Sequence, residues 1–318
     1  MQVGRGTSTY DWTEKWARIP DTESAQTGWA HHDMVISESG DVIGFHQADP
    51  TVLVFDEEGT LKRVVEVEVA NAHGMSLVNE GGSEFLWMAD NTTGKVIKIT
   101  LDGETVMRIQ RPDIDVYREG KYSPTSVAID EVRNGGAGDV WVADGYGESY
   151  VHRYDSAGNY ISSINGEEGE AGAFTQPHGI WVDTRKPKRE LYIADRANGR
   201  VQVYDLEGNF LRTFGREPGK DWLHSPSAFA LSGDLMFLAE LRGCRVTVLD
   251  RNDNLVGYLG ENTGAFLLLD GWPNVPQETL EPGLFNSPHG IAADGQGNVY
   301  VADWLIGGRI TKLTPVNG

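Results

Sequence analysis

Short apolar runs recur along this chain, and each is bounded by Gly, Asp or Asn. The clearest stretch contains four such runs, over residues 179–183, 191–195, 200–204 and 210–215. Short apolar runs separated by turn residues are typical of antiparallel strands joined by tight turns. We find no long helical pattern, so the sequence predicts an all-β protein.

The four-strand pattern repeats about every 40 to 60 residues, a spacing typical of propeller blades. Six units can be aligned, and the last lacks its fourth strand. The sequence therefore predicts one domain over residues 1–318, a six-bladed β-propeller in which the N-terminal stretch 14–19 supplies the missing strand and closes the ring. One position, just before the first strand of each unit, marks the repeat. In chain order it is occupied by His32, His73, Thr125, His178, Ser227 and His289.

Histidine stands at this position in units two, four and six, as His73, His178 and His289. Alternate blades of a six-bladed ring are related by a three-fold rotation, so these imidazoles are expected to converge at one end of the channel. Three neutral imidazoles with an open fourth position form a catalytic zinc site, which acidifies a bound hydroxyl. The alternative is that each histidine only caps its strand by a hydrogen bond.

Residues after the second strand of a unit are expected at the same rim. Tyr146 is a candidate base, because a phenol beside a divalent cation loses its proton more readily. Arg196 could bind a carboxylate in bidentate fashion, or pair with a neighbouring aspartate. Trp304 and His46 are candidate substrate contacts, and His32 is a further one that could equally be structural.

The chain has 318 residues and a formal net charge of −20, which disfavours binding to nucleic acid or to an anionic membrane. We also expect a small-molecule substrate and a monomer. A single cysteine and a start without an apolar segment predict a cytoplasmic location, which leaves a removed leader open.

These motifs are similar to NHL-type propeller repeats, and more narrowly the chain resembles the peptidyl-α-hydroxyglycine α-amidating lyase family. The resemblance implies that His73, His178 and His289 hold a catalytic zinc ion, that Tyr146 is the base and that Arg196 lines the substrate site. It rests chiefly on residues 72–74, 144–146, 176–179, 194–200 and 287–289.

The resemblance also implies a structural calcium ion held by the main-chain carbonyls of Met34, Met75 and Gly290. One position departs from the family, which has a catalytic arginine after a Phe-His pair where this chain has Gln47. Glutamine carries no positive charge to stabilise an oxyanion. We therefore expect a related reaction on a different substrate, with Gln47 contacting that substrate by hydrogen bonds.

The leading hypothesis is a metal-dependent lyase that breaks a C–N or C–O bond of a hydroxylated, carbinolamine-like small molecule. One alternative is a propeller hydrolase, such as a lactonase, with a calcium-type site. Another is a non-enzymatic NHL binding module. The fold alone does not decide among these three.

Overall fold

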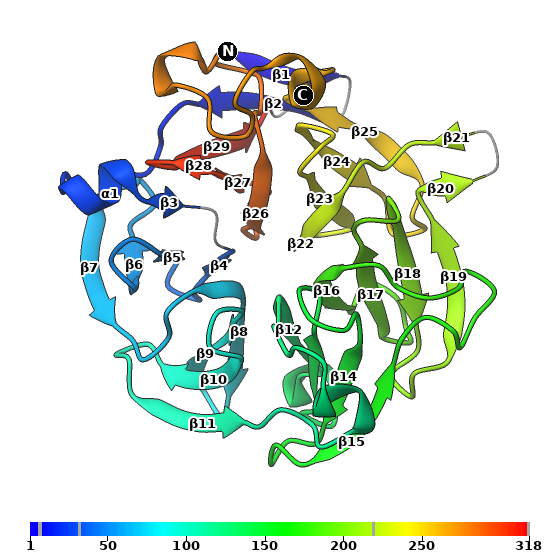
Figure 1. Cartoon of the computed structure of the whole chain (residues 1–318). Coiled ribbons are helices and arrows are strands. Elements are labelled where there is room, and N and C mark those ends of the chain that lie inside the picture. Colours follow the sequence, from blue (N-terminus) through cyan, green and yellow to red (C-terminus); the bar gives the residue numbers. More distant parts are fainter. Residues whose placement is uncertain (6–7, 31–32, 218–219, 317–318) are drawn as a thin grey trace. The chain divides into compact units, whose positions relative to one another are not determined.

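The computed structural model describes residues 1–5, 8–30, 33–217 and 220–316. The described residues form five four-stranded sheets and one five-stranded sheet, and each of these six sheets is a blade. The protein is therefore an all-β, six-bladed β-propeller, as predicted (Figure 1). The chain divides into two compact units. Unit 1 comprises Met1–Glu66 and Ser227–Gly318, and unit 2 comprises Val67–Pro226. The single domain over residues 1–318 stays a prediction.

Unit 2 contains three of the blades, and each follows the chain order without a crossover. The antiparallel pairing continues from the first strand of a blade to its fourth. The strands are β8 (Ala72–Glu80), β9 (Ser83–Asp90), β10 (Lys95–Thr100) and β11 (Thr105–Ile109); β12 (Ser126–Ile129), β13 (Val140–Ala143), β14 (Val151–Tyr154) and β15 (Tyr160–Ile164); and β16 (Pro177–Asp183), β17 (Glu190–Asp195), β18 (Arg200–Tyr204) and β19 (Phe210–Phe214).

Unit 1 contains the other three blades, and one of them combines both ends of the chain. The strands are β4 (Met34–Ile36), β5 (Val42–His46), β6 (Thr51–Phe55) and β7 (Leu61–Glu66); β22 (Pro226–Ser232), β23 (Leu235–Glu240), β24 (Arg245–Leu249) and β25 (Leu255–Leu259); and β26 (Pro288–Ala293), β27 (Val299–Asp303), β29 (Arg309–Pro315), β2 (Ser8–Thr13) and β1 (Gln2–Arg5).

The connections contain short elements. They are α1 (Glu23–Thr27), α2 (Ala265–Leu268), the 3-10 turns η1 (Asp115–Arg118), η2 (Val132–Asn134) and η3 (Gln277–Thr279), and the paired strands β3 (Trp29–Ala30) with β28 (Leu305–Ile306) and β20 (Arg216–Glu217) with β21 (Lys220–Asp221). No helix in the part of the chain that the structure describes is long and apolar enough to cross a membrane.

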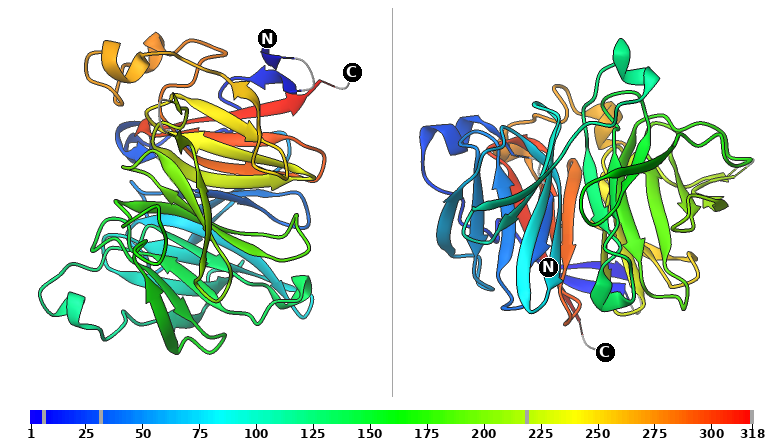
Figure 2. Two further views of the ribbon diagram at one scale, coloured as in Figure 1. Left: turned by 90° about the vertical axis from the view of Figure 1, so that its right-hand side faces the viewer. Right: turned by 90° about the horizontal axis from the view of Figure 1, so that it is seen from below.

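An N-terminal strand completes the last blade, as predicted, but the predicted segment 14–19 was wrong. The strand is β2, which pairs with β29, and β1 adds a fifth strand at the edge (Figures 1 and 2). The chain leaves the sheet at Lys15, whose φ of 47° is left-handed. Trp16 instead packs against Phe55 and Tyr300, so its apolar character reflects the core and not a strand.

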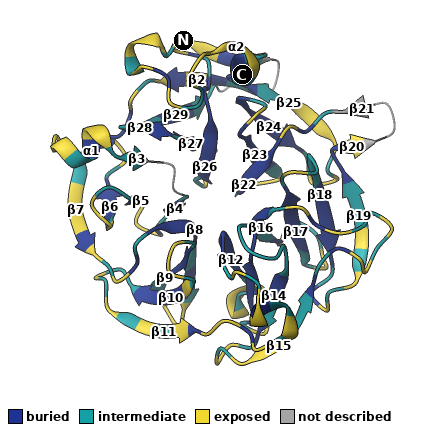
Figure 3. Ribbon diagram, viewed as in Figure 1, coloured by how far each residue is buried: buried dark blue, intermediate teal, exposed yellow. Residues whose placement is uncertain are grey.

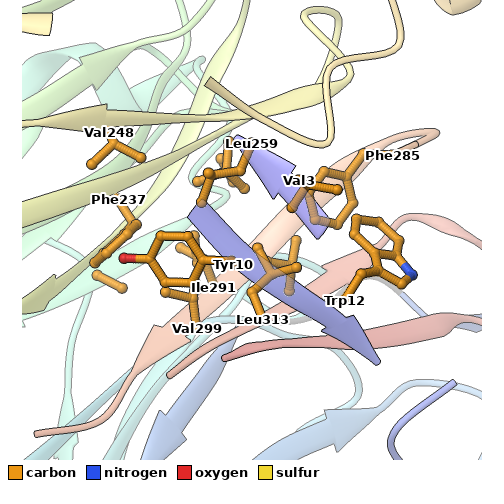
Figure 4. Close-up of a cluster of buried hydrophobic side chains, with 14 of the residues drawn as sticks. Val3, Tyr10, Trp12, Phe237, Val248, Leu259, Phe285, Ile291, Val299 and Leu313 are labelled. Atoms are coloured by element: carbon orange, nitrogen blue, oxygen red, sulfur yellow. The ribbon is translucent and has the colours of Figure 1, made fainter. Parts of the chain in front are cut away.

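The N-terminal strands contribute to the core of unit 1, which explains why they bind there. Trp12 lies 4.6 Å from Phe285 between ring centroids, and Tyr10 lies 6.1 Å from Phe237 (Figure 4). Val3 packs in the same cluster. Burial of each of these aromatic side chains contributes on the order of 2 kcal/mol to the free energy of folding. The last blade is thus held together by side-chain packing as well as by strand pairing.

Burial differs between the strands of one blade (Figure 3). The first three strands of each blade are largely buried, whereas the fourth strand alternates or is largely exposed, as in β11 and β25. Alternation of exposed and buried positions is the pattern of a strand with one face in water. The site residues described next lie at the start of first strands or just after second strands.

Candidate metal centre

A β-bulge lies at each of the three predicted metal-binding histidines. In β8, Ala72 pairs with Asp90 and Gly74 with Ala89, so the register moves by one residue and His73 is the extra one. A bulge leaves its residue out of the ladder and redirects its side chain. The same shift occurs between Pro177 and Ile180 of β16, around His178, and between Pro288 and Gly290 of β26, around His289.

The glycine after His73 allows two first strands to approach closely. A Cβ atom on Gly74 would lie 2.4 Å from the carbonyl oxygen of Thr125 and 2.6 Å from the Cα of Ser126. Both distances are far below van der Waals contact, so only glycine fits here. The His-Gly sequence therefore combines a redirected imidazole with close packing of β8 on the chain that enters β12.

The hydrogen bonding of His73 determines which of its nitrogens could bind a metal. Its Nδ1 lies 2.8 Å from the carbonyl oxygen of Thr125. A carbonyl oxygen only accepts, so Nδ1 carries the hydrogen and Nε2 keeps its lone pair. Burial lowers the pKa of His73 to about 4, and the positive charge of Arg196 acts in the same direction. His73 is therefore neutral at pH 7 and is suited to bind a metal ion through Nε2.

The Nε2 atoms of His73 and His178 face the same phenol. The Tyr146 hydroxyl lies 3.1 Å from Nε2 of His73 and 3.2 Å from Nε2 of His178, and it accepts a hydrogen bond from Nη1 of Arg196 at 3.1 Å. The two imidazole rings are 4.6 Å apart between centroids. A single hydroxyl hydrogen can be donated to only one imidazole at a time. Unit 2 thus brings together four of the predicted site residues.

Thr125 is a site residue that sequence reasoning missed. It occupies the marker position of the third unit, and its carbonyl accepts from His73. Its hydroxyl lies 3.0 Å from the carbonyl oxygen of Pro177, the residue before His178, and accepts from the backbone N–H of Gly145. Thr125 therefore connects the segments that carry His73, Tyr146 and His178. The sequence feature that could have identified Thr125 is its place in the repeat, at the position where other units have histidine.

The Asp-Gly-Tyr loop that carries Tyr146 is held by Asp144. This buried carboxylate accepts hydrogen bonds from the backbone N–H groups of Ser123 and Glu148 and from the hydroxyl of Tyr117, at 2.6 to 2.7 Å. Tyr117 lies in the long connection that contains η1. The phenol oxygen of Tyr117 is also 2.7 Å from Nε2 of His152, in β14. His152 therefore belongs to the buried hydrogen-bond network that holds this loop.

Arg196 follows β17, and a different arginine takes the neighbouring carboxylate. Nε of Arg200 lies 2.6 Å from Asp195. Arg196 instead extends to Tyr146, so the alternative in which it pairs with Asp195 is not the arrangement found. Arg196 is half-buried, and its guanidinium has further donors beside the one that contacts the phenol.

In unit 1, His289 lies near Trp304, which in turn lies against Trp29. Its ring is 6.4 Å from that of Trp304 between centroids, and Trp304 is 5.2 Å from Trp29. Trp304 was predicted as a substrate contact, and Trp29 was not predicted at all. Both indoles are half-buried, whereas the His289 side chain is only 3% exposed.

His46 and Gln47 also belong to unit 1. His46 ends β5 and lines a small, partly open pocket with Met34 and Asp33. Burial lowers the pKa of His46, whereas the charge of Asp49 and a backbone contact with Ala25 act in the opposite direction. The buried side-chain oxygen of Gln47 has no hydrogen-bond partner among the described residues. His32 lies outside the described residues, and the substrate-binding roles of all these residues stay predictions.

The residues predicted to bind calcium lie in first strands. Met34 and Gly290 belong to unit 1, in β4 and β26, and Met75 belongs to unit 2, in β8. Both methionine side chains are 4% exposed. That the main-chain carbonyls of these three residues bind calcium stays a prediction.

A three-histidine group is present whose members could hold a metal ion. His73, His178 and His289 are all buried, and each offers one ring nitrogen. The donor chemistry fits a divalent transition metal, because neutral imidazoles are ligands that zinc and related ions accept.

Comparison with known proteins supports the predicted resemblance. The NHL repeat family model matches residues 285–304, around His289. Peptidyl-glycine alpha-amidating monooxygenase A of Xenopus laevis is 28% identical over 278 residues, which are 80% of this chain and 26% of the relative. A probable peptidyl-alpha-hydroxyglycine alpha-amidating lyase of Caenorhabditis elegans is 26% identical, over 72% of this chain and 60% of the relative. The chain thus spans about a quarter of the first relative and less than two thirds of the second.

Other similar proteins carry different names. Human NHL repeat-containing protein 3 is 25% identical over 84% of this chain and 74% of its own length. Among solved structures, a streptogramin B lyase has a TM-score of 0.63 at 15% identity and covers 96% of this chain and 97% of its own. A gluconolactonase from Xanthomonas campestris has a TM-score of 0.63 at 13% identity, over 97% and 90%. The structural matches support the propeller fold alone.

Proposed function

We propose that this chain is a metal-dependent lyase of the peptidyl-α-hydroxyglycine α-amidating type, acting on a hydroxylated, carbinolamine-like small molecule. The proposal draws on relatives whose names describe amidating lyases and on the three-histidine group. The observation that carries it is the Tyr146 hydroxyl, which lies within 3.2 Å of two candidate ligand nitrogens and accepts from Arg196.

His73, His178 and His289 would hold a zinc-like divalent ion. When bound, such an ion supplies a Lewis acid that makes a substrate hydroxyl more acidic. The chain prepares the ligands in advance, because the Thr125 carbonyl selects the tautomer of His73 and burial keeps that imidazole neutral. The calcium site formed by the carbonyls of Met34, Met75 and Gly290 is a further part of the proposal.

Tyr146 would move the proton in the reaction. In a carbinolamine, loss of the hydroxyl proton is coupled to formation of a carbonyl, cleavage of the C–N bond and protonation of the leaving nitrogen. Tyr146 can take the first proton and return it to the nitrogen, so the step consumes no water and needs no oxidant. Its hydroxyl is positioned for this by one donor and two imidazoles.

Arg196 would hold the phenol oxygen and, through its remaining donors, a substrate carboxylate. Gln47 stands where the resembling family has an arginine, and we propose that it contacts the substrate by neutral hydrogen bonds. A neutral amide stabilises a developing negative charge less than a guanidinium does. The substrate of this chain is therefore expected to differ from a peptidyl-α-hydroxyglycine.

The first test is elemental analysis of the purified protein together with the substitution His178→Ala. We expect about one equivalent of a divalent transition metal in the wild type and a large loss of it in the variant. His224→Ala is a matched control, because His224 is an exposed histidine outside the predicted site. The proposal fails if the wild type takes up no stoichiometric transition metal or if His178→Ala binds it equally well.

The second test follows amide release from a series of N-acyl-α-hydroxyglycines. We expect turnover that depends on the transition metal and that falls strongly in Tyr146→Phe. The lactonase alternative predicts instead hydrolysis of lactones that depends on calcium alone. A binding module predicts turnover of neither class.

A further inference from the structure

A second pocket lies within unit 2, towards the opposite end of β8 from His73. It has a volume of about 510 Å³ and is formed where the β8–β9 hairpin faces the segments that follow β12 and β14. β8 has nine residues, and a strand rises about 3.3 Å per residue, so the outer end of the pocket at Glu80 lies roughly 20 Å from His73. A pocket of this size can hold a small organic molecule.

The pocket contains a lysine on a largely apolar face of its blade. Lys98 of β10 lies opposite Trp87 of β9, and its side chain shares a face with Phe85 and Val78. Those three apolar residues belong to the cluster that packs this blade against β12 and β13 (Figure 1). The Lys98 side chain is only 9% exposed, and its ammonium lies 4.4 Å from the centre of the Phe85 ring. A buried ammonium is costly unless it is paired, so its partner matters.

The carboxylate that pairs with Lys98 is itself exposed. The ammonium donates to Oε2 of Glu80, whose side chain is 48% exposed at the end of β8. A Cβ atom on either of the next two residues, Gly81 and Gly82, would meet no atom within 4 Å, so the hairpin beside Glu80 is open. Because Glu80 regains full hydration when it turns outwards, a second carboxylate can replace it at Lys98 at little cost.

Another hydrogen-bond donor lies in the wall of the same pocket. The Nε1–H group of Trp87 is buried and has no hydrogen-bond partner among the described residues. An indole N–H only donates, and a buried donor without an acceptor is costly. The Lys98 ammonium is 5.9 Å from the centre of the Trp87 ring. A carboxylate has two accepting oxygens, so one such group can reach both donors.

The opposite wall is apolar or already paired. Ile129 and Val132 line it, and Val132 is 67% exposed. The carboxylate of Glu131 lies 2.8 Å from Nε of Arg133 and accepts from the backbone N–H of Asn79 at 3.2 Å. Its charge is therefore compensated within the wall. The pocket thus offers donors on one side and apolar surface on the other.

We infer that this pocket is a second binding site, for a small organic monocarboxylate with an apolar body. The ligand carboxylate replaces Glu80 at Lys98 and accepts from the indole N–H of Trp87, and the apolar body lies against Ile129 and Val132. Binding is reversible and breaks no covalent bond. The inference is independent of the proposed function, because none of these residues belongs to the candidate metal centre.

Hexanoate and hexanamide test the site, because they share an apolar chain and differ in charge. Their affinities for the full chain, with and without added Zn²⁺, can be measured by NMR titration of protein labelled with ¹⁵N in its indoles. The Trp87 resonance is the one that is absent from Trp87→Phe. We expect hexanoate to bind about tenfold more tightly than hexanamide or acetate and to shift the Trp87 resonance, whether or not zinc is present.

Substitutions in the ion pair should change the affinity in opposite directions. Lys98→Met removes the ammonium and should lower hexanoate affinity about tenfold, with hexanamide affinity unchanged. Glu80→Gln removes the competing carboxylate and should raise hexanoate affinity about threefold or more. Lys62→Met is the matched control, because Lys62 also pairs with a carboxylate, that of Asp41 at 2.7 Å, but lies in unit 1. Urea unfolding midpoints establish that each variant is folded.

The outcomes separate this site from the candidate metal centre. Equal affinities of hexanoate and hexanamide, or a hexanoate affinity that neither Lys98→Met nor Glu80→Gln changes, overturns the inference. Binding that requires zinc and leaves the Trp87 resonance unmoved also overturns it, since the carboxylate would then lie at the metal centre. If Lys98→Met does not fold, Glu80→Gln decides the question alone, and the absence of a rise in hexanoate affinity refutes the inference.

Discussion

Replacing Thr125 by valine tests whether this residue positions the candidate ligands. Valine has nearly the same shape as threonine but lacks the hydroxyl. In the wild type that hydroxyl lies 3.0 Å from the Pro177 carbonyl and 3.3 Å from the Ala143 carbonyl, and it accepts from the N–H of Gly145. The Thr125 side chain is 1% exposed, so water cannot readily replace these contacts.

The expected magnitude follows from the groups left without that partner. Loss of one hydrogen bond that leaves a buried donor or acceptor unsatisfied costs about 1 to 3 kcal/mol. We therefore expect Thr125→Val to lower the free energy of unfolding by about 2 kcal/mol in metal-free protein. Because the freed carbonyl belongs to Pro177, which precedes His178, we also expect weaker metal binding, by about ten- to one-hundredfold, as for other groups that orient ligands.

The assay is a titration of the folded, metal-free protein with Co²⁺, followed by its visible absorption, together with urea unfolding. Thr125→Ser keeps the hydroxyl and should bind Co²⁺ like the wild type. Thr213→Val is the matched control, because the Thr213 hydroxyl donates to the Val201 carbonyl at 2.9 Å, in strand β19 away from the ligands. The reasoning is refuted if Thr125→Val binds Co²⁺ with wild-type affinity and spectrum, or if Thr213→Val weakens binding as much.

Three further predictions follow from named contacts. Tyr146→Phe should keep its metal and lower amide release by about a hundredfold or more, since it removes the proton carrier; unchanged turnover would contradict that role. Burial lowers the pKa of His152 to about 3, so the unfolded chain takes up a proton below pH 6.5 that the folded protein resists. Stability is therefore lost as the pH falls from 6.5 towards 3, by up to about 1.4 kcal/mol per pH unit, and urea unfolding of His152→Gln should show a shallower loss than the wild type. Gly74→Ala should lower the unfolding free energy by more than about 2 kcal/mol, because its Cβ would lie 2.4 Å from the Thr125 carbonyl; a midpoint within error of the wild type would show that β8 can shift.

The bulges explain what the repeated His-Gly sequence does structurally. At His73 the ladder of β8 and β9 gains one residue, and the imidazole leaves the ladder. Gly74 follows at the point where β8 approaches the backbone of Thr125 and Ser126 most closely.

The repeat pattern by itself determined the fold class and the elements that carry the candidate site. Strand alternation and turn residues depend on local chemistry, so the strands of the blade that carries His178 and Arg196 were predicted nearly to the residue. The error at residues 14–19 has a related cause, because Trp16 is apolar for core packing and a local pattern cannot distinguish that from strand pairing.

Tertiary structure alone decided the contacts that make the site chemically specific. The tautomer of His73 depends on the carbonyl of Thr125, 52 residues away. Arg200 pairs with Asp195, whereas Arg196 contacts the Tyr146 hydroxyl. Trp29 comes to lie against Trp304 through a two-residue strand with no distinct sequence signal. Such contacts join residues that are distant in the chain, and they depend on three-dimensional packing that no local periodicity encodes.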